Sequence, residues 1–265
     1  MILSQLLKCA FNYTDKSNQI SADSDPRGSP VDISTLSKLG ISSALAHYYL
    51  TSGWLQRLGR GVFALPNDTL ELNACVKFLA DRIPGLHVGG KTALAWRGIL
   101  HNLLQRESIW LFGDLSTILP RWFRDRFAAM YLKRKLFSTK LPHQFGLSPL
   151  PETPDGPLVS EPERALLEML SEVGLRVSVE EARNVMEGLA SPRLETLQVL
   201  LKHCTRIKVV RLCVGWAKEL NLPWADVAGE AIPARVKRNR SRWTSRLKDG
   251  TTLILKPGRL SSRWM

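Results

Sequence analysis

Apolar residues recur at helical spacing at the start of residues 33–66, and a short apolar hairpin pattern ends this stretch. Ile33, Leu36 and Leu39 form one apolar stripe, and Gly40 comes directly after it, where glycine commonly ends a helix. This pattern predicts a first short helix that stops in a tight turn.

A second helix is expected to begin at the capping residues Ser42 and Ser43 and to end at about residue 52, before Gly53. One face of this helix should pack on the core, and Trp54 should fold back onto it. That face comprises Ile41, Leu45, Tyr48 and Ser52. The other side comprises Ser42, Ser43, Ala46, His47 and Leu50.

The small and polar start of this other side suits a helix that enters the major groove of DNA. The N-terminal residues of such a recognition helix meet the edges of the bases. We therefore expect Ser42, Ser43 and His47 to face base edges.

The stretch WLQRLGRGVFALP predicts a strand, a turn that contains glycine, and a second strand. Two helices followed by a hairpin have the order of a winged helix-turn-helix. Arg57 and Arg60 flank the turn, and Lys38 lies at the end of the first helix. We expect these three cations to anchor phosphates or to probe the minor groove.

The charge of the whole chain strengthens this interpretation. Of its 265 residues, 37 are Lys or Arg and 24 are Asp or Glu, which gives a formal net charge of +13. Such an excess favours a polyanionic partner, namely DNA, RNA or an anionic membrane. The sequence has no run of 18 apolar residues and no signal-peptide pattern, so we expect a cytoplasmic protein without a membrane partner.

Side chains that could bind a metal or catalyse a reaction show no recognisable spacing. Four cysteines are scattered without a C-x-x-C pair and five histidines are dispersed, so no metal site is expected. The cysteines should be buried thiols in a reducing compartment. Because no nucleophile–base pair stands in a recognisable frame, we expect no catalytic residue, no cofactor and no enzyme activity.

Residues 85–92 offer an alternative, because GLHVGGKT matches the phosphate-binding pattern G-x-x-x-x-G-K-[ST]. In that interpretation the chain would be a nucleotide-binding enzyme that uses Lys91. A true phosphate-binding loop follows a buried strand, whereas the preceding residues KFLADRIP are charged and helical in pattern. We favour a tight turn before a helix and keep nucleotide binding as a lesser alternative.

The rest of the chain predicts a larger domain of helices and strands. Residues 108–113, SIWLFG, are consistent with a strand, and a helical block follows the proline-rich residues 142–159. Its first two helices begin at S-x-x-E capping boxes. These boxes are Ser160 with Glu163 and Ser178 with Glu181.

A basic run lies near the C-terminal end, where seven cations and no acid occur within the 14 residues from Arg235 to Lys248. These side chains could extend the DNA footprint along phosphates, contact RNA, or form a solvated face without specific function. The candidate DNA contacts in this run are Lys237, Arg238, Arg240 and Arg242.

From about residue 31 onward, several blocks of this sequence resemble the AbiEi-type antitoxins of type IV toxin–antitoxin systems. The blocks follow one another in the order expected for the family. They read LGIS, SGWLQRLGRGVFALP, HVGGKTALAWRGI, IWLFGD, LVSEPERALLEML, ARNVMEGL, KHCTRIKVVRLCVGWAKELNLPW and LILKPGRLSSRWM. The block around IKVVRL is the most distinctive.

The resemblance implies a winged-helix transcriptional regulator joined to a larger mixed domain. Such a protein is expected to repress its own operon by binding operator repeats in double-stranded DNA. It is also expected to oppose a nucleotidyltransferase toxin without forming a stable complex with it. An orphan nucleic-acid-binding protein without a toxin is the main alternative, distinguished by the absence of a nucleotidyltransferase gene beside its own.

Pattern and resemblance together predict an α+β protein of two domains. The winged helix is expected over residues 1–67, and a mixed α/β domain that contributes to antitoxicity over residues 68–265. If about six phosphates are neutralised, the logarithm of the DNA affinity should fall with the logarithm of the salt concentration at a slope of roughly −5.

Overall fold

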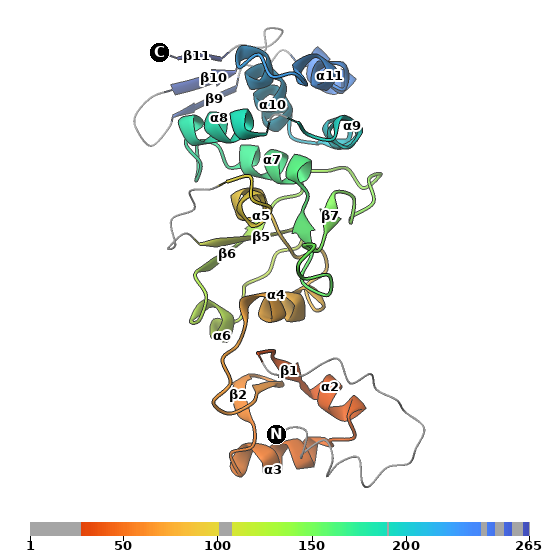
Figure 1. The fold of residues 1–265 in the computed structure, drawn as a ribbon, viewed down its shortest axis with the longest axis vertical. Helices are drawn as coiled ribbons and strands as arrows, with labels where there is room; N and C mark the ends of the chain where they lie inside the picture. Colours follow the sequence, from red (N-terminus) through yellow and green to blue (C-terminus); the bar gives the residue numbers. More distant parts are fainter. Residues whose placement is uncertain are drawn as a thin grey trace. The chain divides into compact units, whose positions relative to one another are not determined.

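The computed structural model describes residues 28–100, 108–189, 191–239, 243–246, 252–255 and 262–264 (Figure 1). The chain divides into two compact units. The first contains the described residues up to Arg82 together with residues 119–127, and the second contains residues 83–118 and the described residues from 128 onward. The expected domains, residues 1–67 and 68–265, stay a prediction, and these units place the boundary differently.

The first unit has the order of elements of a winged helix. Strand β1 (Val31–Asp32) is followed by helices α2 (Ile33–Lys38) and α3 (Ser43–Thr51). Strands β2 (Gln56–Gly59) and β3 (Val62–Ala64) form the hairpin. The sheet is antiparallel in the order β1-β3-β2. The predicted helices, turn and hairpin are thereby confirmed.

The core of this unit corrects the predicted orientation of α3. Ala46, predicted to face outward, is 2% exposed, whereas Tyr48, predicted to face inward, is 63% exposed. Trp54 does not fold onto the core; it is 41% exposed, and Leu55 is buried instead.

The buried side of α3 lies about 100° around the helix axis from the predicted face. It consists of Leu45, Ala46, Tyr49 and Leu50, which pack with Leu36, Ile41, Leu55 and Phe63. Apolar residues occur around most of the circumference of α3, so periodicity alone does not select the buried side. Contact with α2 and β3 selects it.

Helices α4 (Leu72–Ala80) and α6 (Arg121–Arg124) complete the first unit. The rings of Phe78 and Trp122 pack edge to face, with centroids 6.1 Å apart. A Cβ atom on Gly59 of β2 would lie 3.4 Å from Cδ1 of Trp122. Trp122 therefore connects the second strand of the winged helix to α4.

The second unit contains a mixed five-stranded sheet in the order β6-β5-β4-β8-β7. Its strands are β4 (His87–Val88), β5 (Ile109–Gly113), β6 (Ala129–Lys133), β7 (Leu147–Ser148) and β8 (Val159–Ser160). The pairs β5–β6 and β4–β8 are parallel, and the other two pairs are antiparallel. The apolar run predicted as a strand is β5, which is buried over most of its length.

Helices cover this sheet and extend beyond it (Figure 1). Helix α7 (Pro162–Ser171) is buried along its length between α5 (Gly90–Trp96) and a layer of later helices. That layer comprises α8 (Val179–Gly188), α9 (Leu194–His203), α10 (Ile207–Glu219), α11 (Ala225–Glu230) and α12 (Ala234–Arg238). The described part ends in an antiparallel sheet of β9 (Trp243–Arg246), β10 (Thr252–Leu255) and β11 (Ser262–Trp264).

Of the two predicted capping boxes, the one at Ser178 is confirmed as far as its serine cap is concerned. The Ser178 hydroxyl accepts a hydrogen bond from the Glu181 backbone N–H at 3.0 Å and caps α8. The prediction for Ser160 is wrong, because Ser160 ends β8 and its hydroxyl donates to Glu168 at 2.7 Å. Its proposed partner Glu163 accepts instead from the Arg193 backbone N–H at 2.6 Å. Hydrogen bonds distant in sequence replace the local cap.

Candidate nucleic-acid interface

Helix α3 is the element that presents the predicted base-reading residues. The hydroxyl of Ser42 caps the helix by accepting a hydrogen bond from the Leu45 backbone N–H at 3.2 Å. This bond uses the Ser42 oxygen to satisfy one of the free N–H groups of the first turn. Ser43 and His47 are exposed on the helix and make no side-chain hydrogen bond within the described part of the chain.

The exposed side of α3 forms one continuous strip. It consists of Ser43, Ala44, His47, Tyr48 and Thr51, which recur at spacings of three and four residues. Tyr48 is the residue that the sequence analysis missed, because it was assigned to the core face. The available signal was the pair of Ala46, which is buried, and Leu50, which is partly buried, since packing those two inward turns Tyr48 outward.

The hairpin that follows α3 in the sequence carries two of the three candidate phosphate-binding cations. Arg60 and Gly61 connect β2 to β3, and Gly61 adopts a φ of 68°, a left-handed conformation that an L side chain rarely takes. Arg57 and Arg60 are exposed, and so is Lys38 in the last turn of α2. Within the described residues none of the three forms an ion pair, so all three are available to phosphates.

Residues 33–66 contain no carboxylate, and Asp32 immediately precedes them. Asp32 caps α2 by accepting from the Thr35 backbone N–H at 2.8 Å, and it also contacts the Arg82 guanidinium. Partial burial acts to raise the pKa of Asp32, but the hydrogen bonds from Thr35, Arg82 and Ser34 outweigh it and hold the pKa well below its usual value. The carboxylate that directly precedes this segment is therefore already neutralised within the unit.

The basic run near the C-terminal end belongs to the second unit. Lys237 and Arg238 are exposed on α12, whereas Arg240 and Arg242 lie outside the described residues. Arg235 donates from its guanidinium to the Cys204 carbonyl oxygen, so part of the run holds α12 in place. The other six candidates all lie in the first unit. They are Lys38, Ser42, Ser43, His47, Arg57 and Arg60.

The phosphate-binding alternative meets an obstacle at the start of α5. The Gly90 backbone N–H donates to Oε2 of Glu168 at 3.0 Å, so a protein carboxylate already occupies the position that a phosphate would take. Lys91 is buried, and its Nζ lies 3.1 Å from Oε1 of Glu181 and 5.2 Å from the Trp110 ring centroid. Lys91 therefore serves packing and ion pairing.

The cysteines of the described residues are buried and unreactive. Burial raises the pKa of Cys75 to about 12 and that of Cys204 to about 11, and it raises that of Cys213 still further. Their thiols stay protonated near neutral pH, and the predicted burial of these three cysteines is confirmed. The fourth cysteine, Cys9, lies outside the described residues.

The described residues were also searched for metal-binding clusters and for membrane-spanning helices. No group of three or more His, Cys, Asp or Glu side chains stands close enough within them to hold a metal ion. None of their helices is long and apolar enough to cross a membrane.

Comparisons with known proteins cover nearly the whole chain. Residues 106–249 match the family described as transcriptional regulator, AbiEi antitoxin, type IV TA system, and residues 15–105 match the N-terminal domain of the AbiEi antitoxin. A comparison with curated proteins gave no match. Among solved structures, the RV2827C protein from Mycobacterium tuberculosis is similar, with a TM-score of 0.47 and 14% identity over 89% of this chain and 79% of that one. The two family matches show that this chain belongs to the AbiEi antitoxin family of transcriptional regulators of type IV toxin–antitoxin systems.

Proposed function

We propose that this protein represses its own operon by binding operator repeats in double-stranded DNA. The observation that carries the proposal is the exposed strip of α3, which lies in a segment with three exposed cations and no carboxylate. A strip of small and hydrogen-bonding side chains fits the major groove, where each base pair presents a distinct set of donors and acceptors. Acting on DNA, the protein would work in the cytoplasm.

Within this interface the residues divide by task. Ser43, His47 and Tyr48 would contact base edges, because they point outward along one side of α3. Lys38, Arg57 and Arg60 would bind phosphates and set the register of the helix on the duplex. Ser42 acts mainly by holding the first turn of α3 in shape.

Fluorescence anisotropy tests the repressor proposal directly. The DNA upstream of the protein's own gene is compared with a scrambled duplex of equal length. A preference of about tenfold or more that survives about 150 mM salt supports specific repression. Equal binding to both duplexes that disappears with salt would overturn it, because net charge alone would then explain the affinity.

Variants separate the two tasks. Arg60→Ala and Lys38→Ala should each weaken binding to both duplexes by a similar factor, about three- to tenfold. His47→Ala and Tyr48→Ala should reduce the preference for the operator more than the affinity for random DNA. Lys77→Ala is the matched control for Lys38→Ala, since both lysines lie in the last turns of helices in the same unit.

We further propose that the protein opposes a nucleotidyltransferase toxin without a stable complex. Family membership supports an antitoxin role, and the sequence resemblance supplies the class of toxin. Co-expression from separate promoters tests the proposal: growth should be restored although neither protein retains the other on an affinity column. Absence of rescue, together with absence of a nucleotidyltransferase gene beside this one, would favour the orphan alternative.

A further inference from the structure

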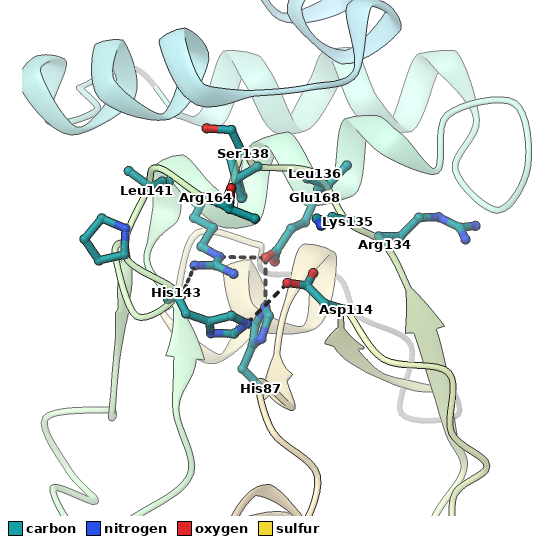
Figure 2. A pocket seen from close by; sticks show the side chains of 13 residues that line it. His87, Asp114, Arg134, Lys135, Leu136, Ser138, Leu141, His143, Arg164 and Glu168 are labelled. Carbon is teal, nitrogen blue, oxygen red and sulfur yellow. Dashed lines mark hydrogen bonds and ion pairs between the residues drawn. The ribbon is translucent and has the colours of Figure 1, made fainter.

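The second unit contains a cavity of about 310 Å³ that the DNA-binding proposal does not use. This volume lies at the lower end of the range for pockets that bind small molecules. It is lined by His87, Asp114, residues 134–139, residues 141–143, Arg164 and Glu168. Figure 2 shows Arg164 and Glu168 reaching from α7 toward His87 and His143.

The buried carboxylate of Glu168 closes one side of this cavity and is fully paired. Its Oε1 accepts from the His87 ring at 2.9 Å and from Arg164 Nε at 3.0 Å. Its Oε2 accepts from the Gly90 backbone N–H at 3.0 Å and from the Ser160 hydroxyl at 2.7 Å. With four donors on two oxygens, Glu168 has no capacity left for a ligand.

Arg164 is more than nine-tenths buried and keeps one end free. Its Nη1 donates to the carbonyl oxygens of His143 and Phe145 at 2.9 and 2.8 Å. Its Nη2 makes no hydrogen bond with any residue that the structure describes. A guanidinium nitrogen with unused donors at the wall of a cavity is suited to an oxyanion.

The remaining charges of the cavity also favour an anionic guest. Lys135 is exposed at the rim and forms no ion pair with the residues described. Asp114 is the second acid, and its Oδ2 lies 3.5 Å from Nε2 of His143. Arg134 is bound to Glu172, which lies outside the lining, at 2.5 Å. Beside the Asp114 carboxylate, the groups left to a ligand therefore include two cationic donors, Lys135 and Nη2 of Arg164.

An apolar wall stands beside these two cations. It consists of Leu136, Phe137, Leu141 and Pro142. The Arg164 guanidinium carbon lies 5.2 Å from the centroid of the Phe137 ring, so the aromatic surface and the free donor are neighbours. A molecule bound here would meet a cation at one end and hydrocarbon along its side.

We propose that this cavity binds a small organic anion, in which a phosphate or carboxylate group is attached to a flat apolar body. The oxyanion pairs with Nη2 of Arg164 and with Lys135, and the body lies against Phe137 and the neighbouring aliphatic side chains. This site is separate from α3 and the hairpin, and it does not depend on DNA binding.

Isothermal titration calorimetry of the full-length protein tests this assignment with phenyl phosphate and benzoate as probes. The probe that binds more tightly shows whether the site prefers a phosphate or a carboxylate. Inorganic phosphate has an oxyanion but no ring, and phenol has a ring but no oxyanion. Each should bind on the order of tenfold more weakly than the tighter probe. Failure of both probes to saturate one site below about 10 mM would overturn the proposal, and so would equal binding of inorganic phosphate or phenol.

Two lysine variants locate the site. Lys135→Glu should weaken the tighter probe on the order of tenfold, whereas Lys133→Glu, an equal charge change on a residue outside the lining, should stay within about twofold. Arg164→Lys keeps the charge but removes Nη2, and it should also weaken binding, with thermal unfolding recorded in parallel. Equal weakening by the two lysine variants would overturn the site, because only the general field would then be responsible.

Discussion

Glu168 is a single residue on which a large part of the second unit converges. Its side chain joins β4, α5, β8 and its own helix α7 through four hydrogen bonds. Burial acts to raise its pKa, but the charge and hydrogen bond of His87, the charge of Arg164 and the hydrogen bond from Ser160 outweigh burial and lower the pKa to about 2. Removing such a carboxylate leaves several buried donors without an acceptor.

Glu168→Gln should therefore lower the free energy of unfolding at pH 7 by about 3 kcal/mol. A lowered folded-state pKa means that this contribution is present above the unfolded-state pKa of about 4.5 and is lost as the pH falls through about 2. At pH 3 less than about half of the difference should remain. Urea unfolding of the unmodified protein and of Glu168→Gln at pH 7, 5 and 3 measures this difference in free energy.

Glu187→Gln on the exposed side of α8 is the control, and it should change the free energy of unfolding little at any of these pH values. A Glu168→Gln effect that does not vary with pH would contradict the assigned ionisation of Glu168.

At the scale of the element, α3 separates what periodicity predicts from what packing decides. The start of the helix at its capping serine and the position of its end follow from local chemistry, and both were predicted. Its rotation about its own axis was predicted wrongly, because Tyr48 and Ala46 both fit a helical stripe. Only contacts with Leu36 and Phe63, from other elements, distinguish the two rotations.

Adjacent serines at the start of α3 give a matched test of this element. Ser42→Ala should cost about 1 kcal/mol of stability by removing the cap on the Leu45 N–H. Ser43→Ala should leave stability almost unchanged and instead reduce the preference for operator DNA. Thermal unfolding and anisotropy on both variants measure the two effects, and equal losses of stability would show that Ser42 is not the cap.

For the molecule as a whole, the net charge of +13 predicts a strong dependence of DNA binding on salt. The operator complex should show a slope of roughly −5 in a plot of log affinity against log salt, if about six phosphates are contacted. Arg57→Ala should make this slope shallower by about one, whereas His47→Ala should leave it unchanged. An unchanged slope for Arg57→Ala would remove Arg57 from the phosphate contacts.

The larger unit shows where sequence reasoning ends. Its mixed class, its strand β5 and its helical block were predictable from local patterns. The cluster of His87, Arg164 and Glu168 was not, because His87 and Glu168 are 81 positions apart and the local pattern around each residue gives no sign that the two side chains pair. The boundary between the units was equally hidden, since α6 joins the first unit only after the chain has entered the second.

That return of the chain has a practical consequence for any attempt to isolate the first unit. The first unit cannot be cut out as one continuous segment, because a fragment ending at Arg82 leaves α6 and its Trp122 behind and uncovers Phe78. A winged helix truncated in this way would lose a packing partner of its own strand β2. A fragment meant to carry the complete first unit must therefore also include residues 119–127.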